Sequence, residues 1–245
     1  GFDRAGVSRD EATRAKVAAL KKEITDLGLR FDANIANGRK TITADPAELD
    51  GLPADYIAAH KPGPDGKVVI STDTPDYSPV MNYARSEALR KRLYEANLTR
   101  AWPANDEILR ALFTKRDELA RLLGRPNPTT LELEDKMIGT PEKALAFLAD
   151  AGRAGESAAK RDYERMVRRL AADQPGATQL TPWSSGYVTQ LIRKESYALD
   201  PQEVRRYFAY NNVRDGMLQL TRDLMGVEIR PWKTPVWDPS VEAYE

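Results

Sequence analysis

NDEILRALFTKRDELARLLG, residues 105–124, decides the fold class because it carries a helix start, a repeating apolar face and a helix end. Asn105 is a residue type that caps helix N-termini, and Asp106 and Glu107 follow where the positive helix end favours acids. Apolar residues then recur at the spacing of one helix face, namely Ile108, Leu109, Leu112, Phe113, Leu119, Leu122 and Leu123. Gly124, followed by Pro126, predicts the end of the helix. The stretch therefore predicts one capped amphipathic helix that packs on a core.

A long helix is predicted upstream, at the start of the chain. Ser8 and Glu11 have the spacing of a capping box, and an apolar face follows at intervals of three and four residues. Its members are Val17, Leu20, Ile24, Leu27 and Phe31. Gly28 lies inside the pattern and is expected to weaken or bend the helix.

The downstream sequence is also helical in pattern. Helices are predicted over 86–97, from Thr140 onward, around 187–192, from Asp200 over an Asp-x-x-Glu capping box, and over 213–224 before Gly226. The helix that opens at Thr140 carries an apolar face with a bend expected at Gly152 and Gly155. The members of this face are Ala144, Leu148, Ala151, Ala159, Tyr163, Met166 and Leu170.

Two short β-branched runs interrupt the helical pattern. Residues 40–43 and 68–72 lie between turn signals and predict two strands, with short helices at 46–49 and 53–59 between them. A further short strand is expected at 227–229. We therefore predict a mainly α fold, a multi-helical lobe with a small antiparallel β element. Residues 1–245 are expected to form a single helical region: a long N-terminal helix (1–37), the β element (38–75) and a helical body (76–245).

Composition excludes several classes of function. The 245 residues contain no cysteine and one histidine, so disulfides, thiol catalysis and a zinc site built from this chain alone are not expected. Lys plus Arg and Asp plus Glu are each 37, which gives no electrostatic case for a nucleic-acid or membrane partner. No apolar run approaches the roughly 18 residues of a membrane span.

Few side chains suggest chemistry of their own. His60 lies at the frayed end of a predicted helix and is expected to be a solvated, non-catalytic histidine. The acidic group Glu132, Glu134 and Asp135 could supply paired carboxylates for acid/base work. Glu132 and Glu134 are two residues apart and do not share a helix face, however, so a solvated surface or a cap is favoured.

Two segments mix basic and aromatic residues, a combination that can bind nucleic acid. Residues 85–102 hold five basic residues beside Tyr94 and Trp102, but interspersed glutamates favour an amphipathic helix. Residues 205–210 raise the same question, and their aromatics are expected to make core contacts at a helix junction. Their members are Arg205, Arg206, Tyr207, Phe208 and Tyr210. The arginines could also line a cleft for a peptide carboxylate. No residue is assigned a catalytic, metal-binding or substrate-binding role.

The order of segments resembles a known family. Leu131-Glu-Leu-Glu-Asp-Lys-Met137, followed by Thr140-Pro141-Glu142, is similar to Leu-Glu-Asp-Lys-Met-x-x-Thr-Pro-Glu in bacterial members of the thimet oligopeptidase family of zinc metallopeptidases, which includes oligopeptidase A and dipeptidyl carboxypeptidase. Further matching segments are Leu52-Pro53, Asp55-Tyr56-Ile57, Lys67 to Thr72, Tyr77-Ser-Pro-Val-Met81, Trp183, Tyr187, Tyr197-Ala-Leu-Asp200, Tyr207-Phe208, Leu224-Met225-Gly226 and Val236-Trp237. The likeness extends from about Val17 to the C-terminus.

The resemblance implies a function for a larger parent protein. Family members carry zinc on a His-Glu-x-x-His helix with a further Glu downstream, and a chain with one histidine cannot contain that motif. Family members also commonly follow the tryptophan at 183 with aspartate, where this chain has Ser184. The resemblance implies an N-terminal, non-catalytic part that forms a wall of a channel for short peptides. Its expected partner is the C-terminal catalytic half, with zinc in the parent and none in this chain.

The sequence also supports an alternative function and an expected location. The alternative function is a helical interaction module that keeps the peptidase scaffold without its activity. The expected location is the cytoplasm, or the periplasm or cell exterior if a signal peptide precedes the chain.

Overall fold

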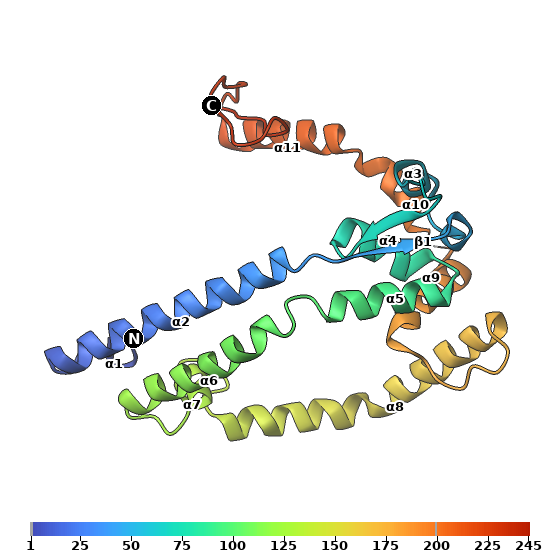
Figure 1. Cartoon of the computed structure of the whole chain (residues 1–245). Coiled ribbons are helices and arrows are strands. Elements are labelled where there is room, and N and C mark those ends of the chain that lie inside the picture. Colours follow the sequence, from blue (N-terminus) through green and yellow to red (C-terminus); the bar gives the residue numbers. More distant parts are fainter. Residues whose placement is uncertain (1, 199) are drawn as a thin grey trace. The chain divides into compact units, whose positions relative to one another are not determined.

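The computed structural model describes residues 2–198 and 200–245, and the mainly α fold class is confirmed (Figure 1). The chain divides into two compact units, Gly1–Ile192 and Arg193–Glu245. Leu199, which belongs to one of the segments similar to the oligopeptidases, lies outside the described residues.

The first unit is built around an antiparallel pair of long helices, α2 (Glu11–Asn37) and α6 (Ala104–Leu122) (Figure 1). Asn34 at the end of α2 donates to Asn105 at the start of α6 over 2.8 Å. Two short helices lie beside the pair, α1 (Phe2–Ala5) and α7 (Pro128–Leu133). The core of this group consists of Val17, Ala120, Leu123 and Leu131.

Two of the predicted helix caps are wrong. Asp10, not Ser8, caps α2, because its side chain accepts a hydrogen bond from the Thr13 backbone N–H at 2.9 Å. Asn105 lies inside α6, and its Nδ2 donates to the Phe31 carbonyl at 3.0 Å. Ser8 and Asn105 are both of a residue type that caps helices. Asp10 takes the capping position in the first case, and the contact with Phe31 engages Asn105 in the second.

The small β element matches its prediction. Strands β1 (Thr41–Ala44) and β2 (Val68–Ser71) pair antiparallel, with Thr41 opposite Ser71 and Ala44 opposite Val68. The 3₁₀ helix η1 (Pro46–Leu49) and helix α3 (Ala54–Ala59) connect the strands.

Helices α4 (Thr74–Tyr83) and α5 (Glu87–Leu98) follow the sheet and close the main core of the unit. Ser86 caps α5 by accepting from the Leu89 N–H at 3.2 Å. The core comprises Ala44, Leu49, Leu52, Tyr56, Val68, Ile70, Val80, Ala84, Leu89 and Leu93.

A third small core joins α8 (Pro141–Asp173) to α9 (Pro182–Tyr197). Leu170, Tyr187 and Val188 are buried there. Thr140 and Pro141 open α8 as predicted, and the helix continues through both glycines at which a bend was expected. Leu170 is the one buried residue of α8 within the described part of the chain, so most of its predicted core face is exposed.

The second unit contains α10 (Pro201–Arg205), the 3₁₀ helix η2 (Arg206–Phe208) and α11 (Tyr210–Met225). Gly226 ends α11 with a φ of 65°, the left-handed conformation expected of a C-terminal glycine. The strand expected at 227–229 does not form. Backbone pairing begins later, where Pro231 makes an isolated bridge to Tyr244.

Candidate functional site

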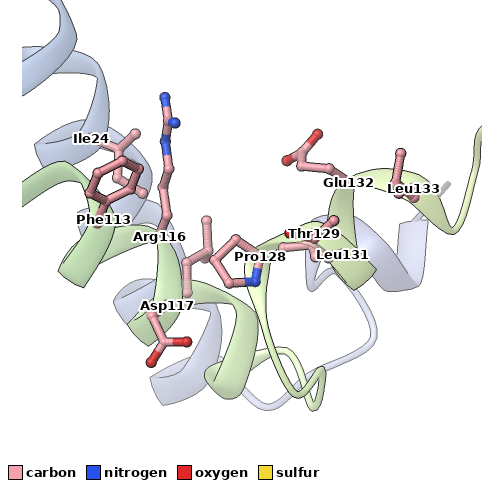
Figure 2. Close-up of a pocket in the computed structure, with 10 residues that line it drawn as sticks. Ile24, Phe113, Arg116, Asp117, Pro128, Thr129, Leu131, Glu132 and Leu133 are labelled. Carbon is pink, nitrogen blue, oxygen red and sulfur yellow. The ribbon is translucent and has the colours of Figure 1, made fainter. Parts of the chain in front are cut away.

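An open groove of about 940 Å³ lies between α2, α6 and α7 (Figure 2). Its floor and walls are largely apolar, and its charged groups are Arg116, Asp117 and Glu132. The full lining is Ile24, Phe113, Arg116, Asp117, Leu119, Pro128, Thr129, Leu131, Glu132 and Leu133. This composition suits an apolar ligand or peptide segment with a small number of polar contacts.

The α7 wall of the groove is held rigidly against the rest of the unit. Leu131 is buried in the core formed by α2 and α6. Asn127 caps α7 by accepting from the Thr130 N–H at 2.9 Å. Arg125 binds Glu134 through two nitrogen–oxygen contacts of 2.9 and 3.1 Å, which links the turn before α7 to the residue that ends it. The groove is therefore preformed.

The charges of the groove differ in how they are paired. Asp117 accepts from Arg121 at 2.7 Å, and Glu132 lies 3.9 Å from Arg4. Arg116, which extends beside Phe113 in Figure 2, has no hydrogen-bond or ion-pair partner among the residues that the structure describes. The groove thus presents one uncompensated positive charge next to an exposed aromatic ring.

The acidic group singled out in the sequence does not form a pair of catalytic carboxylates. Glu134 binds Arg125, while Asp135 binds Arg4 at 2.5 Å and Lys136 at 3.2 Å. Asp135 is solvent-exposed, and the pKa of its carboxyl is lowered because these cations outweigh its partial desolvation. Each carboxylate of the group faces a cation, and none faces another carboxylate within hydrogen-bond distance in the described chain.

His60 is not the solvated residue that its position at a helix end predicts. Its side chain is only 18 % exposed, and its ring stacks on Tyr56 with centroids 3.9 Å apart. Nδ1 lies 2.9 Å from the Tyr56 carbonyl oxygen, and Nε2 lies 3.0 Å from Asp76 Oδ1. Asp76 contributes the contact that a local sequence pattern could not reveal.

The Asp76 carboxylate joins β2, α3 and α4. Its Oδ2 accepts from the Ser71 N–H at 2.9 Å and from the Ser71 hydroxyl at 2.5 Å. Burial opposes the ionisation of Asp76, but the hydrogen bonds from Ser71 and His60 outweigh it and lower the pKa. Ser, His and Asp are all present, yet His60 contacts Asp76 and not Ser71, so the cluster does not activate a serine nucleophile.

The basic segment 85–102 contains a fully buried cation that sequence analysis missed. Arg90 is 0 % exposed, its Nε donates to the Trp183 carbonyl at 2.9 Å, and its Nη1 donates to the carbonyls of Ala84 and Arg85 at 2.5 and 3.1 Å. Its guanidinium lies 4.3 Å from the centre of the Tyr187 ring. Burial lowers the pKa of this guanidinium. A signal existed in the sequence, since Arg90 is three residues from Leu93 on the inward face of α5.

Arg90 thereby connects α5 to α9 at Trp183. Trp183 Nε1 also donates to Glu87 at 3.0 Å. Ser184, at the position where aspartate is common in the resembling family, is fully buried, and its hydroxyl lies 2.6 Å from the Thr181 hydroxyl. Serine satisfies this buried position without introducing a charge.

The aromatics of residues 205–210 do not make the core contacts that were expected. Tyr207 is 82 % exposed, and Phe208 and Tyr210 are also exposed. Arg206 binds Glu203 at 2.7 Å. The prediction is wrong because the described part of this unit supplies no buried residue in α10, η2 or α11 against which these rings could pack.

A comparison with known protein families identifies the chain. The family model for peptidase family M3 matches residues 80–245. The chain belongs to peptidase family M3. The matched region of this M3 chain begins at Val80 in α4 and includes Arg90, the groove residues of α6 and α7, and Trp183.

Curated relatives of the M3 chain extend the match over the whole sequence. Oligopeptidase A of Escherichia coli is 26 % identical over all of the chain, which covers 38 % of that protein. The organellar oligopeptidase A of Arabidopsis thaliana is 30 % identical over 98 % of the chain, which covers 33 % of it. Dipeptidyl carboxypeptidase of E. coli is 28 % identical over all of the chain, which covers 38 % of it. The resemblance is confirmed, and the chain spans about a third of the length of these relatives.

Neither a metal-binding cluster nor a membrane helix is found in the described part of the M3 chain. Over residues 2–198 and 200–245, no group of three or more His, Asp or Glu side chains is placed to hold a metal ion. Within the same ranges, no helix has the length and apolar character that crossing a bilayer requires.

Proposed function

We propose that the chain is the N-terminal, non-catalytic part of a zinc-dependent oligopeptidase that hydrolyses short peptides, in which it forms a wall of the substrate channel. The observation that carries the proposal is the match of the whole chain to about a third of each relative named an oligopeptidase or a carboxypeptidase. A cytoplasmic location is proposed with it.

The zinc ion of such a parent does not fit the residues of this chain. A His-Glu-x-x-His helix needs two imidazoles on one face, and the sequence has one histidine, which is already bound to Asp76 and to a backbone carbonyl. We therefore assign no catalytic step to these residues. Their contribution is to orient a peptide and exclude water, which lowers the entropic part of the barrier.

Exposed apolar surface supports the view that further protein covers this chain. Leu145, Phe147 and Leu148 on α8 are each more than 60 % exposed, and Met217 and Leu220 on α11 are also exposed. Leu145 and Leu148 are three residues apart and so lie on one face of α8, and large exposed apolar patches mark interfaces.

The test is reconstitution from two separately produced pieces. The chain is mixed with the remaining part of its parent and with zinc, and hydrolysis of short quenched peptides is measured with and without a chelator. We expect the chain alone to be inactive and the mixture to show chelator-sensitive hydrolysis. Hydrolysis by the chain alone after chelation would contradict the metallopeptidase assignment, and full activity of the other piece by itself would contradict the channel-wall role.

The alternative function is a helical interaction module on the same scaffold. The extensive exposed apolar surface fits this alternative as well. Association of the two pieces without hydrolysis under any zinc condition, together with an inactive intact parent, would favour it.

A further inference from the structure

The groove of Figure 2 and a second hollow lie along the α2/α6 pair, and we call the two together the strip. A second, smaller hollow of about 230 Å³ is lined by Phe31 and Ile35 of α2 and by Trp102 and Leu109 near the start of α6. Leu109 and Phe113 are four residues apart, so they lie on the same side of α6. Because α2 and α6 are antiparallel, the two hollows follow one another along the pair.

The dimensions of this strip fit a helix. From Asn105, which lines the smaller hollow, to Arg116, which lines the larger one, the axis of α6 extends about 16 Å, or about three turns. A third helix laid along two antiparallel helices presents apolar residues at intervals of three and four to such a strip. Two large aromatic residues of the strip are well exposed, Phe113 at 60 % and Trp102 at 70 %.

The charge of the groove specifies a feature of its occupant. Arg116 is the groove cation that lacks a partner in the described chain, whereas Asp117 and Glu132 already face Arg121 and Arg4. A carboxylate on the polar edge of the bound helix would pair with Arg116. The occupant is therefore an amphipathic helix with an acidic residue beside its apolar face.

We propose that the groove between α2, α6 and α7 is the docking site for one such helix from the remaining part of the same parent protein. The inference rests on the proposed function, because the partner is the rest of the oligopeptidase. The relatives are about three times as long as this chain and so provide the additional sequence from which the helix would come. The preformed α7 wall means that docking needs no rearrangement of the groove.

The test compares Phe113→Lys with a matched control, Thr114→Lys. Both positions are exposed on α6, but Phe113 lines the groove, and Thr114 is the next residue and points about 100° away from it around the helix. The dissociation constant between the chain and the separately produced remainder of the parent is measured by calorimetry. We expect Phe113→Lys to weaken binding by about tenfold or more and Thr114→Lys by less than about twofold.

A second variant tests whether the charge of Arg116 contributes to binding, and folding controls accompany all the variants. Arg116→Glu removes the unpartnered cation without touching the core, and we expect it to weaken binding by about three- to tenfold. Each variant is first shown to keep the circular dichroism spectrum and melting temperature of the unsubstituted chain. Equal binding by all three variants, or no binding of the unsubstituted chain, would overturn the proposal.

Two further measurements separate the possible occupants. Light scattering of the chain alone tests a second copy, because self-association lost in Phe113→Lys and kept in Thr114→Lys would assign the groove to a dimer and overturn the proposal. Peptide hydrolysis by the intact parent tests the proposed function independently. If the parent hydrolyses peptides but the groove variants bind the remainder as tightly as the unsubstituted chain, only the docking site is rejected. If the groove variants weaken binding but the intact parent does not hydrolyse peptides, only the proposed function is rejected.

Discussion

Replacement of Arg90 by methionine tests whether the buried guanidinium holds α5 and α9 together. The variant removes three hydrogen bonds, from Nε to the Trp183 carbonyl at 2.9 Å and from Nη1 to the carbonyls of Ala84 and Arg85 at 2.5 and 3.1 Å. Each carbonyl that loses its donor inside the protein costs about 1–3 kcal/mol. The loss of the contact with the Tyr187 ring adds about 1 kcal/mol.

Part of this loss is offset because Arg90 is itself expensive to bury. Burial lowers the pKa of its guanidinium, and one of its amino nitrogens, Nη2, has no hydrogen-bond partner in the described structure. Methionine has a similar length, fills the cavity and requires no desolvation of a charge. We expect the free energy of unfolding of the first unit to fall by about 3 kcal/mol, the result of these opposing effects.

The measurement is urea unfolding followed by far-ultraviolet circular dichroism and by tryptophan fluorescence. With an m-value of about 2 kcal/mol/M, a loss of about 3 kcal/mol lowers the midpoint by about 1.5 M. The control is Arg116→Met, which removes an exposed arginine without a partner in the described chain and should change stability by less than about 0.5 kcal/mol. A change below about 1 kcal/mol for Arg90→Met would refute the reasoning.

Three further predictions concern a carboxylate, a glycine and a metal. Asp76→Asn should cost about 1–2 kcal/mol near neutral pH. Because the folded-state pKa of Asp76 is lowered, its contribution is present above about pH 4 and lost as the pH falls, so urea midpoints of wild type and variant should converge in acid. Gly51→Ala should lower the melting temperature more than Gly66→Ala, since both have positive φ but only at Gly51 would Cβ meet a backbone oxygen, that of Tyr83, at 2.4 Å. Metal analysis after dialysis should find less than stoichiometric zinc, because one histidine and no cysteine make a poor zinc site.

Helix positions could be predicted from the sequence because their signals are local. The apolar repeat of residues 105–124 and the glycine at its end locate α6 within a residue or two. Gly124 and Gly226 both adopt positive φ, which only glycine adopts without strain, and each follows the last turn of its helix. The β-branched runs located β1 and β2 for the same reason, since each is bounded by its own turn residues.

Side-chain roles could not be predicted where the partner is distant in the chain. Asn105 has the residue type of an N-cap, but its partners Phe31 and Asn34 are more than 70 residues away. His60 was interpreted as solvated because its neighbours form a turn, whereas Asp76 reaches it from the next helix. Arg90 is one of five basic residues in 85–102, and no local pattern indicates that the Trp183 carbonyl accepts a hydrogen bond from it.

The groove could not be predicted either, because its lining residues come from segments that are distant in the sequence. The sequence places Phe113 and Leu119 on one predicted apolar face, yet only the fold reveals that α7 turns back and that Phe113 and Leu131 line one hollow. Arg116 could not be distinguished from the other arginines of α6 by sequence, because its significance lies in having no ion-pair partner among residues 2–198 and 200–245.

In helix α8 the amphipathic pattern predicts the helix itself but not which of its residues are buried. Its spacing determines that 141–173 is a helix and which side chains share a face, because those depend on the backbone period alone. Burial depends on a second surface, and in the described chain Leu170, near the end of α8, is the one residue of the helix that is buried. Leu148 belongs to the same face and remains 64 % exposed. A helix face that is apolar in sequence but exposed in the fold therefore predicts that another protein surface covers it. This M3 chain spans about a third of the length of its relatives, and we propose that the remainder of the parent supplies that surface.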